Sequence, residues 1–95
     1  MKIRNGVIST VVCDEFLVIA TREARPFCSS RYTQLNSSGR LIWESVERGE
    51  PIEEIISALQ KRFPTVADKI AKDVRTFCAS MMEKGFLCED TNNDG

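Results

Sequence analysis

The sequence has 95 residues, which is the size of one small domain. Apolar residues make up 42% and charged residues 28%, a composition typical of a globular rather than a disordered protein. The formal net charge of -1 argues against a non-specific binder of nucleic acid or of acidic membranes. The chain contains no histidine, the commonest general base and a frequent zinc ligand, which excludes most hydrolase and zinc-site interpretations.

No apolar run approaches the ~20 residues of a membrane span, and residues 1–6 lack the apolar segment of a signal peptide. We therefore expect a cytoplasmic protein that does not interact with membranes. The four cysteines form no C-x-x-C pair and have apolar neighbours, which predicts free thiols in or near the core. They are Cys13, Cys28, Cys78 and Cys88. A disulfide or a reactive thiol is the alternative.

The first third of the chain predicts strands. Residues 7–12 are rich in β-branched side chains, and an apolar run follows at 16–19. Between them, the acidic pair Asp14-Glu15 predicts the turn of a hairpin. A third strand is expected at 30–35, after an irregular link through Arg25-Pro26. Together these segments predict a three-stranded antiparallel meander.

The next part of the chain predicts two helices with apolar stripes. Asn36 is a good N-cap, and the apolar face that follows it ends at Gly49. Pro51 suits the first position of a second helix, because proline has no N–H to leave unpaired there. Pro64 ends that helix, since its ring is incompatible with a helix interior.

A third helix is expected before Gly85. Thr65 and Asp68 resemble a capping box at its start, and its stripe consists of Ile70, Val74, Phe77, Cys78 and Met81. The order is thus three strands followed by three helices (βββααα), an α+β fold whose helices share one core against the sheet. Residues 1–88 form this domain. Residues 89–95 have no apolar side chain to bury, which predicts a disordered tail.

No catalytic constellation is visible in the sequence. The serines have no histidine to activate them and no G-x-S-x-G elbow. The five glycines form no phosphate-binding loop. We therefore expect neither an enzyme nor a bound cofactor or metal.

Two binding modes remain open from the residues alone. A small βββααα domain invites a winged-helix interpretation, but the third helix carries a net charge of only about +1, which suits phosphate binding poorly. The third strand, at Arg31-Tyr32-Thr33-Gln34, contains neither lysine nor proline, so its edge can accept an extended peptide. An ordinary half-exposed strand explains that sequence equally well.

The block from 31 to 43, R-Y-T-Q-L-N-S-S-G-R-L-I-W, resembles the R-Y-x-x-L-N-x-T-G-x-x-I/V-W motif of PqqD-like domains. These domains are the leader-peptide recognition elements in the biosynthesis of ribosomally made, modified peptides (RiPPs). The similarity continues to Gly85-Phe86-Leu87 and spans about residues 7–88. Ser38 replaces the usual threonine. The glycine that the family has before the third strand is absent, so a longer or irregular hairpin is expected there.

The resemblance implies a winged-helix-like fold that binds peptide without catalysis. In the family, the leader adds a strand beside the third strand and lies in a groove between it and the third helix. Carried onto this chain, this implies a site made by Ser30, Arg31, Tyr32, Thr33, Gln34, Lys69, Lys72, Asp73, Thr76, Phe77 and Ser80. By their helical spacing, Leu35, Ile42 and Trp43 are expected in the core instead.

The length of the chain and its R-Y-x-Q-L-N stretch look most like the stand-alone leader-binding subunit of lasso-peptide leader peptidases. This resemblance implies a transglutaminase-like cysteine protease as partner, with an ATP-dependent cyclase as a further candidate, and no cofactor. A recognition partner of a radical-SAM peptide-modifying enzyme is the alternative. A winged-helix DNA-binding regulator is a more distant one.

Overall fold

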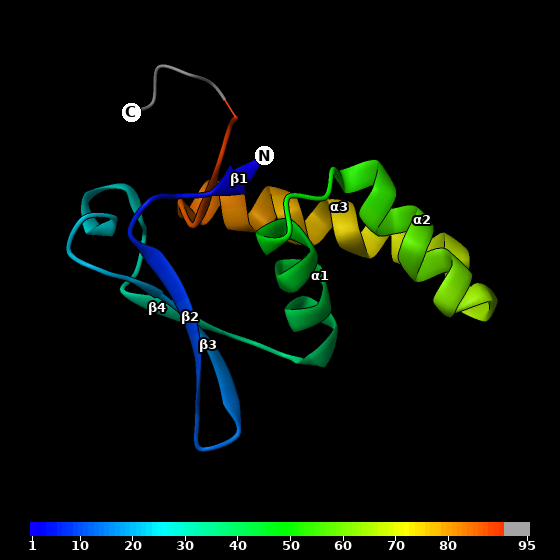
Figure 1. Cartoon of the computed structure of the whole chain (residues 1–95), viewed down its shortest axis with the longest axis horizontal. Helices are drawn as coiled ribbons and strands as arrows, with labels where there is room; N and C mark the ends of the chain where they lie inside the picture. Colours follow the sequence, from blue (N-terminus) through cyan, green and yellow to red (C-terminus); the bar gives the residue numbers. More distant parts are fainter. Residues whose placement is uncertain (91–95) are drawn as a thin grey trace.

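The computed structural model describes residues 1–90. A short N-terminal strand precedes a three-stranded meander, three helices follow, and a second short strand comes after them (Figure 1). The described elements are β1 (Lys2–Ile3), β2 (Val7–Val12), β3 (Glu15–Ala20), η1 (Arg25–Phe27), β4 (Tyr32–Leu35), α1 (Ser37–Glu47), α2 (Ile52–Arg62), η2 (Pro64–Val66), α3 (Ala67–Lys84) and β5 (Leu87–Cys88).

The predicted meander is confirmed. Strands β2, β3 and β4 pair antiparallel in that order, so β2 and β4 are the edges. The predicted turn is wrong by one residue, because Val12 pairs with Glu15 and Glu15 already belongs to β3. The turn is Cys13-Asp14, where both residues have positive φ, as a two-residue hairpin turn of this kind requires.

The strand expected at 30–35 starts at Tyr32. The link before it contains the 3-10 helix η1, so the expected irregular hairpin is confirmed. This link lies against the end of α3, where the Ser29 N–H donates to the Lys84 carbonyl at 2.9 Å. The backbone of Phe27 passes so close to Gly85 that only a residue without a side chain fits there.

The helix signals were mostly correct. The Asn36 side chain caps α1 by accepting from the Gly39 N–H at 2.8 Å. Pro51 is the N-cap of α2 rather than its first residue. The predicted capping box is wrong: Thr65 lies within η2, which displaces the start of α3, and Val66 takes the N-cap position without a side-chain hydrogen bond.

The pairing of β1 with β5 was not predicted. Lys2 lies opposite Cys88 and Ile3 opposite Leu87, and this ribbon brings the two ends of the domain together. Asp90 also forms an ion pair with the α-amino group of Met1. Of the predicted tail, residues 91–95 lie outside the described part of the chain.

The core lies between the inner face of the sheet and the three helices. Alternate residues of β3 enter it, and Trp43 of α1 is completely buried at its centre. The helical residues buried with it include Ile42, Val46, Ile55, Ile56, Val74 and Met81. These positions repeat with helical spacing in the sequence, which is why the stripes identified the core faces correctly.

All four cysteines are free, as expected. Cys78 and Cys88 are buried and Cys28 is half-buried. The placement of Cys13 near the core was wrong, because this residue lies in the hairpin turn and is exposed.

Candidate functional site

A groove of about 490 Å³ lies between β4 and α3. Strand β4 forms one wall, α3 forms the other, and the beginning of α1 closes the floor. The lining residues are Thr33, Gln34, Leu35, Asn36, Ser38, Gly39, Ile42, Lys69, Asp73, Thr76, Phe77, Ser80, Met81 and Lys84.

The helical wall is one face of α3. Its lining positions recur three or four residues apart, which places them on the same side of a helix. Phe77 is half-buried at the middle of this wall. Its ring approaches the first turn of α1 closely, since a Cβ on Gly39 would lie 3.2 Å from the Phe77 Cε1 atom. The glycine thus lets the Phe77 ring pack against the floor of the groove.

The strand wall has a backbone edge that pairs with no further strand in the described residues. Thr33 lies opposite Val18, and the Ala20 N–H donates to the Arg31 carbonyl at 2.8 Å. Because antiparallel hydrogen bonds alternate along a strand, the backbone groups of Tyr32 and Gln34 point away from β3. The Ser30 hydroxyl donates to the outward carbonyl of Tyr32 at 3.1 Å. This edge can therefore pair with a further extended chain.

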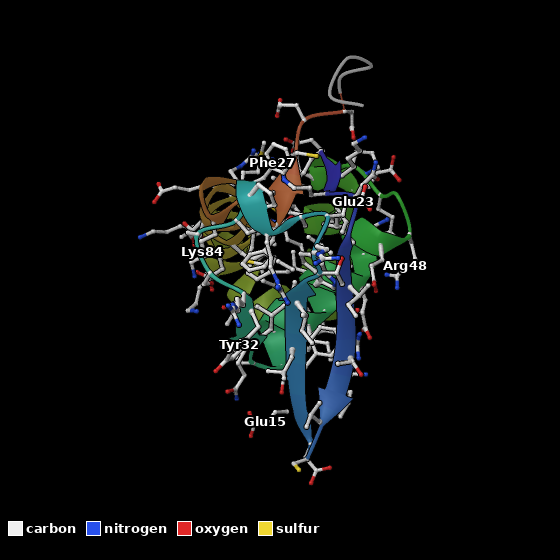
Figure 2. The ribbon with its side chains drawn as sticks, turned by 90° about the vertical axis from the view of Figure 1, so that its left-hand side faces the viewer. Glu15, Glu23, Phe27, Tyr32, Arg48 and Lys84 are labelled. Carbon is white, nitrogen blue, oxygen red and sulfur yellow. The ribbon has the colours of Figure 1, made fainter. Side chains whose placement is uncertain are left out.

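The side chains of β4 alternate between two faces of the sheet. Thr33 and Leu35 are partly buried on the groove side, whereas Tyr32 is 61% exposed on the other side. Tyr32 lies opposite Ile19, which lies opposite Ile8, so the three side chains form a row on the outer face of the sheet. Figure 2 shows Tyr32 at the side of the molecule, next to the hairpin.

The structure brings together most of the residues implied by the resemblance. Those that line the groove are Thr33, Gln34, Lys69, Asp73, Thr76, Phe77 and Ser80. Tyr32 is the first residue of β4 and follows Ser30 and Arg31, and all three lie outside the groove lining. Lys72 is exposed elsewhere on α3.

Some groove residues were missed by sequence reasoning. Lys84 follows Ser80 and Phe77 on the same helical face, so the helical period could have identified it. Leu35 and Ile42 were expected in the core. Ile42 is buried and Leu35 is half-buried, yet both also line the groove. Trp43, expected in the core as well, is fully buried.

Most of the residues that line the groove are uncharged. Lys69 donates to the Asp73 carboxylate at 2.6 Å, so these two charges offset each other. Within residues 1–90, no three potential metal-ligating side chains cluster. None of the helices in this range has the length and apolarity needed to cross a membrane.

Residues 17–87 match the family model described as coenzyme PQQ synthesis protein D (PqqD), a range that contains both walls of the groove. The chain belongs to the PqqD family. Its fold agrees with the α+β arrangement expected from the sequence, a three-stranded antiparallel sheet followed by three helices.

A solved structure similar to this PqqD-family chain is described as TbiB1 in complex with the TbiA(beta) leader peptide. The two chains are 25% identical and superpose with a TM-score of 0.76, covering 97% of this chain and 100% of that one. That protein was therefore solved with a leader peptide bound. The comparison with curated proteins gives no significant match.

Proposed function

We propose that this chain is a non-catalytic recognition protein that binds the leader of a ribosomally made precursor peptide. The observation that carries the proposal is the unpaired edge of β4, which forms one wall of a groove whose other wall is α3. The likeness to TbiB1, which was solved with a leader peptide, supports the same function.

Binding by strand addition follows from this geometry. The outward backbone groups of Tyr32 and Gln34 would pair with the leader, which fixes its register. Alternate side chains of the leader would then enter the groove and pack against Phe77 and Leu35. A micromolar affinity, about -8 kcal/mol, would hold the leader near a processing enzyme and still allow its release.

The processing enzyme belongs to the same proposal. The length of the chain and its R-Y-x-Q-L-N stretch at residues 31–36 resemble lasso-peptide leader-binding subunits. This resemblance supports presentation to a transglutaminase-like cysteine protease, with the ATP-dependent cyclase as the next partner. Because precursor peptides are made by ribosomes, the cytoplasm is the compartment in which the chain would act. Co-purification with the enzymes encoded beside this gene tests the partner, and capture of a radical-SAM enzyme instead would contradict the lasso assignment.

A pair of proline variants tests strand addition. The Gln34 N–H points away from β3, so Gln34→Pro removes one donor to the leader but leaves the β3–β4 ladder intact. We expect the variant to remain folded and to bind at least about 10-fold more weakly, because a backbone hydrogen bond is lost and the proline ring obstructs pairing. The measurement is isothermal titration with the leader of the precursor encoded beside this gene.

Thr33→Pro is the matched control. The Thr33 N–H faces β3, so this change breaks the sheet itself and should lower the melting temperature. A folded Gln34→Pro protein with wild-type affinity would rule out pairing at this edge. Binding of the wild-type protein to promoter DNA but not to the leader would contradict the function itself.

A further inference from the structure

The charges that line the groove are unevenly distributed. At one end, Lys69 and Asp73 form an ion pair one helical turn apart. The remaining charged lining residue is Lys84, which takes part in none of the ion pairs within residues 1–90. The other lining residues are uncharged, so the groove has one uncompensated positive charge.

Lys84 lies at the end of the groove where the chain enters β4. Its carbonyl accepts from the Ser29 N–H, three residues before the strand begins. Asp73 lies eleven residues earlier on α3, about 16 Å away along the helix axis at 1.5 Å per residue. The ion pair and the free cation thus occupy opposite ends of the groove. Figure 2 shows Lys84 and Tyr32 on the same side of the molecule.

Arg31 adds a second positive charge at this end. Its carbonyl already pairs with the Ala20 N–H, so the strand geometry extends to this residue. Because side chains alternate along an extended chain, Arg31 lies on the same face of the sheet as Thr33, just beyond the residues that line the groove. The Arg31 side chain is exposed and belongs to none of the ion pairs within the described range.

We propose that Lys84 at the end of the groove, together with Arg31 just beyond the groove lining, selects leaders that carry an acidic side chain at this position. The inference rests on the proposed function and specifies which peptides the site accepts. A carboxylate of the leader at this position would be attracted by two cations that have no ion-pair partner within the described residues of the protein. A lysine or arginine of the leader would be repelled. The charge would also orient the leader, since the opposite end of the groove is neutralised by the Lys69–Asp73 pair.

The geometry fixes the spacing of this acid within the leader. Alternate residues of an added strand face the same side, about 6.6 Å apart. The acidic side chain must therefore be separated by two or four residues from the apolar side chain that packs over Phe77. An acid at an odd separation would face the outer surface beside Tyr32 instead.

A charge reversal at Lys84 tests the inference. The probe is the leader of the precursor encoded beside this gene, with variants in which each Asp or Glu is changed singly to Asn or Gln. Fluorescence anisotropy should show that Lys84→Glu weakens binding about 3- to 10-fold, because an exposed attraction becomes a repulsion. Lys84→Gln removes the positive charge without placing an acid at the C-terminus of α3, where a negative charge would destabilise the helix. This variant should show a smaller loss of leader affinity. Lys61→Glu, in the last turn of α2 and outside the groove, is the matched control and should bind normally.

Two results together would support the proposal. The loss of leader affinity in Lys84→Glu should become smaller at high salt. A leader in which the acid at the stated spacing is changed to lysine should bind Lys84→Glu with restored affinity. The proposal is overturned if Lys84→Glu and Lys84→Gln are both folded and bind the leader as tightly as Lys61→Glu does. Binding of the leader by the wild-type protein would show in that case that the proposed function stands. Failure of the wild-type protein to bind the leader would instead overturn the proposed function and this inference with it.

Discussion

Phe77 contributes to both the core and the groove. Its ring packs against the buried cluster, yet it is only half-buried because one side lines the groove. A fully buried phenylalanine costs about 3–5 kcal/mol of stability when changed to alanine. For Phe77→Ala we expect about half of that, roughly 2 kcal/mol, with leader affinity reduced more than 10-fold.

Phe77→Leu separates the two roles. Leucine retains an apolar surface over Gly39, so it should recover most of the stability and part of the affinity. Urea unfolding gives the first quantity and titration with the leader gives the second. A Phe77→Ala protein that keeps full affinity would show that the leader does not reach the centre of the groove.

At the scale of elements, the junction between α3 and the link before β4 depends on Gly85. This residue ends the helix with a φ of 93°, and a Cβ on it would lie 1.9 Å from the Phe27 carbonyl oxygen. Gly85→Ala should therefore cost about 2–4 kcal/mol, from the left-handed backbone and the displaced link. Thermal unfolding should show a decrease of roughly 10 °C or more.

Gly49→Ala is the control for this substitution. Gly49 has a similar φ of 81°, but nothing lies within 4 Å of the position of its Cβ. Only the backbone penalty applies there, roughly 1–2 kcal/mol. Equal losses in the two variants would mean that the contact with Phe27 does not hold the link in place.

The sequence predicted the long elements and missed the short ones for physical reasons. The stripes of α1, α2 and α3 each repeat over several turns, so the pattern is unambiguous. Strands β1 and β5 have two residues each, too few for any periodicity, and form only because the chain ends meet. The hairpin turn was misplaced because acidic residues mark turns in general, whereas Cys13 supplies the required backbone angle without any such signal.

At the scale of the molecule, the site combines segments that are far apart in the sequence. Thr33 and Phe77 line one groove although more than forty residues separate them, and no local pattern predicts that contact. The resemblance to PqqD-like domains supplied it. The same resemblance did not indicate that Tyr32 faces the outer surface, which follows from the register of β4 with β3.

The core gives the molecule a defined dependence of stability on pH. Burial raises the pKa of the Cys78 thiol, so the folded protein holds this proton more tightly than the unfolded chain does. The contribution of this thiol to the free energy of unfolding should be constant below the ordinary thiol pKa of about 8.5 and fall as the pH rises beyond it. One such thiol contributes a slope of at most about 1.4 kcal/mol per pH unit.

Urea unfolding between pH 7 and 10 under reducing conditions measures this slope. Cys78→Ala should be less stable at neutral pH, because it leaves a small cavity, but its stability should decline less steeply above pH 8.5. Burial also raises the pKa of Cys28, with the Arg4 charge opposing it, so some of the slope should remain. If Cys78→Ala declines as steeply as the wild-type protein, the buried thiol is not what makes the fold sensitive to alkaline pH.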